Sequence, residues 1–418
     1  MRKPLTITML SDSPTIPTGY SNQSKLLARY LRSKGHTIHY LGNSYNGATV
    51  KRLELADGTV FDYNIYGEMV HSYFMNTISE HLKTTKSDIF YILLDTFMLM
   101  PTPFNGMLLD KDLAPARSLF WYPSDGGKFP AGCEKVLRKV DVSVAMSKFA
   151  QKQVKDYHRI QTEYIPHGTE PNRFFRMSDE DRNKLRMAWG FHDKFVVGVV
   201  ARNQPRKFLD RTLRTIALLK DKIPNIILFM HMDPNDAAQA FNLIEMVKQL
   251  GLENRVVFSG MKAHAGWDWN KMNEVYNLMD IFFLSTSGEG FGIPTIEAMA
   301  AEVPVVATDY TTTQELVKDH GAGFGVNLVG TEEIDLMKED LRVYDMRVMN
   351  GTLPGSWMVD RGLCDIKDAA AKIIVLANDP GLRKQMGING RKAVLEEYDF
   401  DKQIGPQWEE LFYKTLGQ

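Results

Sequence analysis

Two carboxylates and three glycines lie close together in segment 285–302. Glu289 and Glu297 have seven residues between them. The glycines surround the first glutamate, at positions Gly288, Gly290 and Gly292. Glycine lets the backbone approach a ligand closely, and the free N–H groups of a helix N-terminus favour a phosphate. The glutamates would instead accept hydrogen bonds from hydroxyls, such as those of a ribose or a sugar. The segment therefore predicts a site for a phosphorylated, hydroxyl-rich ligand.

A strand and a helix are predicted on the two sides of this turn. The apolar run Ile281–Leu284 has the length of a buried strand, and Pro294 is typical of a first helical turn. We expect the helix over Thr295–Ala301, with Glu297 in its first turn. There Glu297 could merely complement the helix dipole, worth roughly 0.3–1 kcal/mol, and Glu289 could be a solvated loop residue. The pair together with the glycines favours the ligand site.

Basic residues follow an earlier predicted strand, Phe195–Ala201. Arg202 and Lys207 come after it, with Arg206 beside them. A reaction that expels a nucleoside diphosphate must stabilise negative charge on the leaving oxygens. An arginine and a lysine held at a strand end can do this. The alternative is a solvated basic loop, and composition alone leaves both interpretations open.

The turn around the glutamates resembles the Glu-X7-Glu signature of the retaining glycosyltransferases of family four. The resemblance rests on the order Gly-Phe-Gly-Ile-Pro-Thr-Ile-Glu-Ala-Met-Ala that begins at Gly290. It implies that Glu297 holds the ribose of a nucleotide and that Glu289 contacts the donor sugar. The backbone of Phe291 and Gly292 would face the diphosphate. The predicted donor-binding residues of this turn are Gly290, Phe291, Gly292, Ile293 and Glu297.

The basic residues fit the same resemblance. Family-four enzymes carry an arginine and a lysine here, usually as Gly-Arg-Leu-X-X-X-Lys-Gly. The corresponding segment reads Ala-Arg-Asn-Gln-Pro-Arg-Lys-Phe from Ala201 to Phe208. Its position favours a phosphate clamp made by Arg202 and Lys207. The missing glycine after Lys207 leaves the register open, and Arg206 could substitute.

Two positions in the first half are implied by the resemblance. Gly19 lies in a predicted loop before helix Asn22–Ser33, where members often have two adjacent glycines; Tyr20 takes the second place. Gly19 would let the backbone close over the diphosphate or sugar, although the segment could be only a turn. Asp125 follows the predicted strand Ser118–Tyr122, where members commonly present a histidine to the donor sugar. Its alternative is a simple Asp-Gly-Gly turn.

Met261 follows the predicted strand Val256–Ser259 and matches the segment whose backbone reads the nucleobase in related enzymes. Asp95, at the end of another predicted strand, is a weaker candidate, with a helix N-cap as its alternative. The histidines lack metal-ligand spacing, and no Asp-X-Asp stands at a strand end. We therefore predict no metal and no cofactor, with the nucleotide sugar acting as donor substrate.

Apolar runs alternate with helical patterns through the chain, which is typical of βαβ units and parallel sheets. A chain of 418 residues is expected to form two domains of about 200 residues. The best linker candidate is Ile165–Pro171, with two prolines and a glycine. The sequence therefore predicts an α/β protein of two doubly wound halves, 1–168 and 169–400.

By resemblance the fold is GT-B: two Rossmann-like domains face each other across a cleft, and the last helix, 401–418, packs back on the first. Residues 327–360 look like an insertion without an assigned role.

Charge and composition narrow the partners. A formal net charge of −1 argues against a nucleic-acid partner. The first 170 residues carry a small excess of basic residues, so weak contact with an anionic membrane surface stays open. The two cysteines, Cys133 and Cys364, are too few and too separated for a disulfide framework, and the N-terminus lacks a signal-peptide pattern. These features predict a cytoplasmic protein.

The predicted function is transfer of a sugar from a nucleoside-diphosphate sugar to a carbohydrate, lipid or other hydroxyl acceptor, with retention of configuration. A sugar-nucleotide epimerase or an inverting transferase on the same fold is one alternative. A non-catalytic nucleotide-sugar binding or scaffold protein is another. The sequence identifies neither the base, the sugar and the acceptor nor the oligomeric state. A nicotinamide oxidoreductase is disfavoured, because no Gly-X-Gly-X-X-Gly turn follows the first strand.

Overall fold

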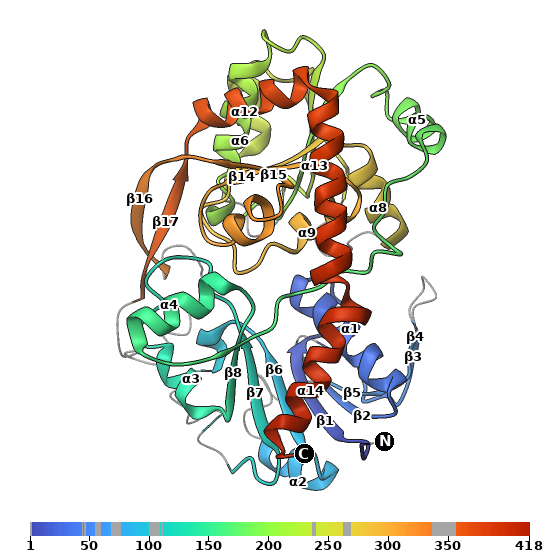
Figure 1. Cartoon of the computed structure of the whole chain (residues 1–418), viewed down its shortest axis with the longest axis vertical. Helices are drawn as coiled ribbons and strands as arrows, with labels where there is room; N and C mark the ends of the chain where they lie inside the picture. Colours follow the sequence, from blue (N-terminus) through green and yellow to red (C-terminus); the bar gives the residue numbers. More distant parts are fainter. Residues whose placement is uncertain are drawn as a thin grey trace. The chain divides into compact units, whose positions relative to one another are not determined.

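The computed structural model describes most of the chain and divides it into two compact units. The described residues are 2–43, 45, 47–54, 60–67, 77–99, 109, 112–235, 240–261, 269–336 and 357–418. Unit 1 comprises residues 1–167, 334–359 and 400–418, and unit 2 comprises residues 168–333 and 360–399. Figure 1 shows the helices and strands that make up each unit.

Unit 1 is built on a seven-stranded parallel sheet with strand order β5-β2-β1-β6-β7-β8-β9. The strands are β1 (Thr6–Asp12), β2 (Thr37–Asn43), β5 (Asn64–Tyr66), β6 (Ile89–Leu93), β7 (Arg117–Tyr122), β8 (Val142–Ala145) and β9 (Glu163–Tyr164). A short pair, β3 (Leu53–Glu54) and β4 (Val60–Phe61), is antiparallel. From β1 the chain proceeds towards one edge and from β6 towards the other. The strand order therefore reverses between β1 and β6.

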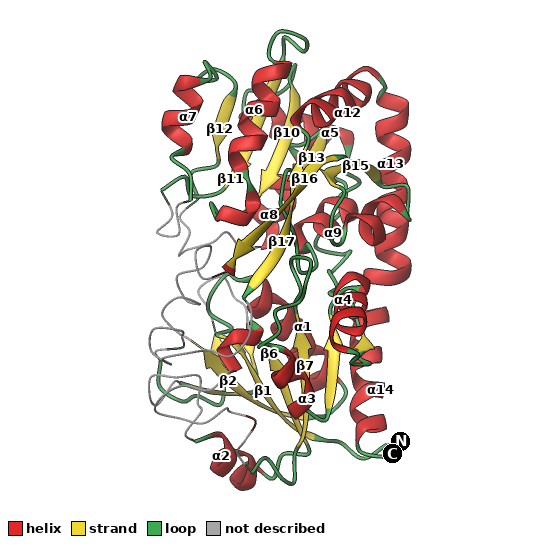
Figure 2. Cartoon of the chain, turned by 90° about the vertical axis from the view of Figure 1, so that its left-hand side faces the viewer, coloured by secondary structure: helices red, strands yellow, loops and turns green. Residues whose placement is uncertain are grey.

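Helices cover both faces of this sheet (Figure 2). They are α1 (Gly19–Ser33), α2 (Ile78–Thr85), α3 (Glu134–Lys139), α4 (Lys148–His158) and α14 (Gly405–Thr415). Successive side chains of a strand point to opposite faces. Phe90 and Ile92 pack with α2, α3 and α4, whereas the ring of Tyr91 lies 5.1 Å from that of Trp408 on α14. A side chain at Gly405 would collide with the Tyr30 ring, so this glycine permits close packing of α14 on α1.

Unit 2 has a six-stranded parallel sheet of order β12-β11-β10-β13-β14-β15. Its strands are β10 (Phe195–Val200), β11 (Ile226–His231), β12 (Val256–Phe258), β13 (Ile281–Leu284), β14 (Val305–Thr308) and β15 (Gly323–Val326). One face packs on α6 (Leu209–Leu219), α7 (Leu243–Gln249) and α12 (Ile366–Asn378). The other helices are α5 (Asp179–Ala188), α8 (Trp269–Asn277), α9 (Ile293–Ala300) and α13 (Pro380–Ala393). In this sheet the strand order reverses between β10 and β13.

Several predicted boundaries are wrong by a few residues. The apolar run Val303–Ala307 predicts a strand, but β14 begins only at Val305, because Pro304 has no N–H group for the ladder. Helix α1 begins at Gly19 and not at Asn22, because the Thr18 hydroxyl caps it by accepting from Ser21 N–H. Helix α9 likewise begins two residues before the predicted start. The apolar runs Ile226–His231 and Ile281–Leu284 each predict a strand, and both strands have these bounds.

The segment 327–360, which looks like an insertion from the sequence, contains strands at its ends. β16 (Leu328–Asp335) and β17 (Met358–Cys364) form a two-stranded sheet. Trp357 belongs to the hydrophobic core of unit 1. Residues 337–356 lie outside the described part of the chain. Among the helices that are described, none is both long enough and apolar enough to cross a bilayer.

Candidate active site

The two predicted groups of site residues follow β10 and β13. These strands are neighbours in the sheet, and the strand order of unit 2 reverses between them. In open parallel sheets, ligands bind outside the carboxyl ends of the strands at such a reversal. The loop 201–208 after β10 and the loop 285–292 after β13 therefore lie where a ligand is expected.

Glu289 forms ion pairs with two cations of the loop after β10. Lys207 Nζ lies 2.5 Å from Glu289 Oε1, and Arg206 Nη1 lies 3.0 Å from Oε2. Glu289 is only 8% exposed. Burial by itself raises the pKa of this carboxyl, but the charges of Lys207 and Arg206 outweigh it and lower the pKa to about 2. Glu289 is thus a carboxylate at neutral pH, held between two cations.

The backbone of Arg206 joins the two loops. Its carbonyl oxygen accepts hydrogen bonds from Ser287 N at 2.7 Å, Ser287 Oγ at 2.9 Å and Thr286 Oγ1 at 3.2 Å. Its guanidinium Nη1 donates to the carbonyl of Gly288 at 3.2 Å. The structure therefore brings Arg206 to Glu289 together with Lys207. Arg202, the first choice from the sequence, has an exposed side chain, and its carbonyl accepts from the N–H of Gln204.

Two residues next to this group have left-handed backbone without being glycine. Phe208 has a φ of 43°, at the position where the resembled family has the glycine after its lysine. Thr311 has a φ of 51°, and its hydroxyl accepts the N–H of Glu289 at 3.0 Å. Such a conformation costs an ordinary residue of order 1–3 kcal/mol. The sequence analysis missed Thr311, because nothing in its local pattern distinguishes it from a turn residue.

Glu297 is buried beside a tyrosine. The Tyr276 hydroxyl donates to Glu297 Oε2 at 2.5 Å, and Glu297 is 7% exposed. Burial raises the pKa of Glu297 to about 7, and the bond from Tyr276 limits the rise. Glu297 is the fifth residue of α9, so the expectation that it lies in the first turn is wrong. It does not simply complement the helix dipole. Tyr276 was missed, because an aromatic residue in a helix has the same pattern as a core residue.

The other predicted residues of this turn lie at the start of α9. Gly292 has a φ of 105°, which favours glycine, and its carbonyl accepts the N–H of Thr295. Phe291 is buried, with its ring 6.0 Å from that of Tyr398. Gly290 and Ile293 are half-buried.

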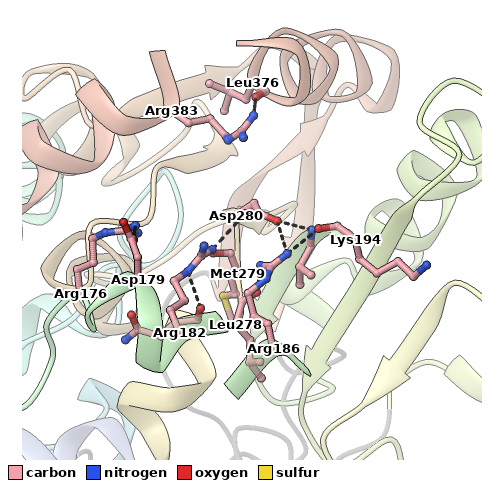
Figure 3. Close-up of polar contacts among 12 residues, drawn as sticks. Arg176, Asp179, Arg182, Arg186, Lys194, Leu278, Met279, Asp280, Leu376 and Arg383 are labelled. Atoms are coloured by element: carbon pink, nitrogen blue, oxygen red, sulfur yellow. Dashed lines mark hydrogen bonds and ion pairs between the residues drawn. The ribbon is translucent and has the colours of Figure 1, made fainter. Parts of the chain in front are cut away.

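An ion-pair network holds the amino ends of the strands that carry the site (Figure 3). Arg182 and Arg186 of α5 point towards Asp280, with N–O distances of 3.1 and 3.2 Å. Asp280 also accepts the N–H of Val196 on β10 at 2.8 Å, and it immediately precedes Ile281, the first residue of β13. The network therefore fixes the two strands relative to each other. No motif in the sequence indicates it.

In unit 1, the predicted residues lie at the carboxyl edge of the sheet. Gly19 is the first residue of α1 and not part of a loop, which corrects the prediction. The hydroxyl of its neighbour Tyr20 donates to Asp95 at 2.8 Å. Burial raises the pKa of Tyr20 well above its usual value, and the charges of Asp95, Asp125 and Asp12 raise it further. Tyr20 therefore keeps its proton at neutral pH and is the hydrogen-bond donor to Asp95.

Met261 lies beyond β12, and its N–H donates to Ser259 Oγ at 3.4 Å. Residues 262–268, which follow it, lie outside the described part. Within the described residues no group of three or more His, Cys, Asp and Glu side chains could hold a metal ion.

Residues 181–336 match the family model of glycosyl transferases group 1. The mannosylfructose-phosphate synthase of Agrobacterium fabrum is 34% identical over 162 residues, which are 37% of this chain and 34% of that protein. The chain thus spans about a third of that relative's length.

Solved glycosyltransferase structures match nearly the whole chain. Sucrose-phosphate synthase from Thermosynechococcus elongatus has a TM-score of 0.71 and 16% identity, over 99% of each chain. Anabaena HepE in complex with UDP-glucose has a TM-score of 0.70 and 16% identity, over 98% of this chain and 100% of that one. These likenesses confirm the predicted fold, a GT-B protein with two parallel-sheet, Rossmann-like α/β domains.

The segment that matches the group 1 model includes both loops of the candidate site and Tyr276, which the sequence analysis missed. Lys207, Tyr276, Glu289 and Glu297 all lie within positions 181–336. The match therefore covers the contacts that unit 2 makes around its strand-order reversal.

Proposed function

We propose that this protein is a retaining glycosyltransferase that moves a sugar from a nucleoside-diphosphate sugar to an acceptor hydroxyl. The observation that carries the proposal is the pairing of Glu289 with Lys207 and Arg206, on the loop that leads into the helix of Glu297. Carboxylates accept hydrogen bonds from the hydroxyls of a sugar nucleotide, and cations form ion pairs with its phosphates. The family match and the UDP-glucose named for the HepE complex support a nucleotide-sugar donor.

The basic residues are assigned to the donor diphosphate. Arginine can grip phosphate oxygens with a planar fork, whereas Lys207 supplies a compact charge. As the bond to the sugar breaks, negative charge grows on the leaving phosphate. Fixed cations then stabilise the transition state more than they stabilise the bound donor. Arg206 and Lys207 are the principal pair, with Arg202 as a third member. The N–H groups of Gly290–Gly292 would add hydrogen bonds.

In the proposed reaction the acceptor hydroxyl attacks the anomeric carbon from the face that the phosphate leaves. The new C–O bond forms as the bond between the anomeric carbon and the phosphate oxygen breaks, and the electron pair of the broken bond stays on the phosphate. The acceptor proton passes to that phosphate, so no side-chain base is required. Glu289 orients the donor sugar and Glu297 the ribose, while Met261, Gly19 and Asp125 are assigned to the donor as predicted.

We infer that the reaction needs no metal ion, because Arg206 and Lys207 can supply the charge that a divalent cation supplies elsewhere. Full activity in excess EDTA would support this. Activity lost in EDTA and restored by Mg²⁺ would overturn it. The proposed acceptor is a carbohydrate, a lipid or another hydroxyl compound, and the proposed location is the cytoplasm.

A ligand screen tests the function. UDP, GDP and ADP and their sugars are compared by thermal unfolding, because a ligand at 100 times its dissociation constant stabilises the fold by about 2.7 kcal/mol. The donor that binds is then followed for hydrolysis and transfer, and NMR gives the anomeric configuration of the product. Binding without any turnover would favour a non-catalytic binding protein. An inverted product would exclude the retaining mechanism.

A further inference from the structure

Among the described residues, Tyr276 is the hydrogen-bond partner of the Glu297 side chain. Its hydroxyl donates to Glu297 Oε2 at 2.5 Å, and Tyr276 itself is fully buried. Burial raises the pKa of Tyr276 well above its usual value, and the nearby Glu297 raises it further, so the hydroxyl keeps its proton. It can therefore act only as a donor towards a carboxylate. The bond uses Oε2 and leaves Oε1 for other contacts.

The ring of Tyr276 is fixed by its neighbours. It meets Phe174 edge-on at 5.8 Å and Phe282 of β13 at 6.1 Å. Helix α8 is tied to a neighbouring loop, because Asn273 accepts the N–H of Phe175 and Asn277 accepts that of Met177, both at 2.9 Å. A buried ring on an anchored helix has little rotational freedom. The position of the hydroxyl is therefore set by the fold.

Two other titratable groups, on elements that pack against α9, have hydrogen-bond partners of their own. Arg391 of α13 donates to backbone carbonyls, and Tyr398 of η5 (Val394–Tyr398) meets His320 at 3.3 Å. The remaining charged side chains of α8, α13 and η5 are Lys271, Glu274, Arg383, Lys384, Lys392, Glu396 and Glu397. Burial raises the pKa of Glu297, and the hydrogen bond from Tyr276 limits the rise.

We infer that Tyr276 is a positioning residue that orients the Glu297 carboxylate towards the two hydroxyls of a ribose. The inference rests on the proposed function and extends it to the choice of nucleotide. When a hydrogen bond fixes one oxygen of a carboxylate, the other oxygen points in a set direction. A ligand that lacks the hydroxyl for that oxygen leaves a buried polar group unpaired, which costs binding free energy. The site should therefore distinguish ribonucleoside diphosphates from their 2′-deoxy analogues, and the discrimination should depend on Tyr276.

The experiment compares Tyr276→Phe with the parent by titration calorimetry. The probes are the nucleoside diphosphate found in the ligand screen and its 2′-deoxy analogue, each between pH 6 and 9. We expect the variant to bind the ribonucleotide about tenfold more weakly, and the deoxynucleotide within about twofold of the parent. The pH below which ribonucleotide binding weakens should move upwards, because the hydroxyl that stabilises the carboxylate is gone. The kcat at saturating donor should change much less than the KM.

Two further variants separate positioning from folding. Tyr413→Phe removes the hydroxyl of a buried tyrosine in unit 1, which donates to Lys3 O at 2.8 Å, and it should leave both affinities unchanged. In a Glu297→Gln background, Tyr276→Phe should have little additional effect on ribose discrimination. Equal weakening of both nucleotides, or unchanged binding of both, would overturn the inference while the proposed function stands. A parent that binds neither nucleotide would overturn both.

Discussion

Lys207 Nζ and Glu289 Oε1 are 2.5 Å apart, and each side chain is only 10% exposed. The Glu289 carboxylate therefore already forms an ion pair with Lys207, a cation that the proposed function assigns to the donor diphosphate. Arg206 completes the arrangement on the second carboxylate oxygen at 3.0 Å. In the proposed site, Glu289 would offset part of the positive charge before the donor binds, and it would turn towards the sugar when phosphate takes over the cations.

Replacing Glu289 with glutamine should strengthen binding of the nucleoside diphosphate and abolish most sugar transfer. The amide keeps the shape of the side chain but removes a negative charge that competes with phosphate for Lys207 and Arg206. We expect up to about tenfold tighter binding at low salt, a gain that shrinks as salt is added. Titration calorimetry gives the affinity and a transfer assay gives the turnover.

The matched control is Glu180→Gln, which makes the same change in net charge at an exposed pair with Lys184. It should affect neither quantity. Weaker nucleotide binding by Glu289→Gln than by the parent would show that the carboxylate does not compete with the diphosphate.

The raised pKa of Glu297 predicts a pH dependence of stability. Burial raises this pKa from 4.5 to about 7, so the folded protein keeps the proton over a range in which the unfolded chain loses it. The stabilisation is fully present below about pH 4.5 and is lost as the pH rises through about 7. It amounts to at most about 3 kcal/mol. Glu297→Gln should remove this component.

Urea unfolding of the parent and of Glu297→Gln between pH 5 and 8.5 measures the effect. The parent should lose stability relative to the variant as the pH rises. Two curves that stay parallel over the whole range would contradict the raised pKa.

The pairing of Asp280 with Arg182 and Arg186 predicts a large loss of stability in Asp280→Asn. The side chains of Asp280 and Arg186 are 13% and 6% exposed, so the change leaves a buried guanidinium without its counter-charge. Breaking a buried pair in this way costs about 3–5 kcal/mol. Urea unfolding gives the difference in free energy of unfolding.

The control is Asp179→Asn, which removes the ion-pair partner of Arg176; both residues are labelled in Figure 3. The Asp179 side chain is 82% exposed, and exposed pairs contribute at most about 1 kcal/mol. Similar losses in the two variants would mean that the Asp280 network contributes no more than a surface pair.

Local patterns predict strands of the sheet in unit 2, because a buried parallel strand is a continuous apolar run. Ile281–Leu284 and Ile226–His231 therefore have their predicted bounds. Contacts between distant segments leave no such pattern. Tyr276 reaches Glu297 from another helix, and Asp280 meets α5 across 94 residues of sequence from Arg186. The pairing of Glu289 with Arg206 likewise depends on how the loop after β10 folds, and the sequence does not determine this.

Phe208 provides a test of backbone strain beside the site. Its φ of 43° is unfavourable for a phenylalanine and natural for a glycine. Phe208→Gly should therefore relieve strain of about 1–3 kcal/mol, although it loses the contact of the ring with Arg211 and increases the entropy of the unfolded chain. The comparison variant Phe208→Ala loses the same ring but keeps a Cβ in the left-handed conformation. We expect Phe208→Gly to be more stable than Phe208→Ala by about 1 kcal/mol in thermal or urea unfolding. Donor turnover should survive in Phe208→Gly, because the backbone that places Lys207 is kept. If Phe208→Ala proves the more stable of the two, the left-handed conformation is not a source of strain at this position.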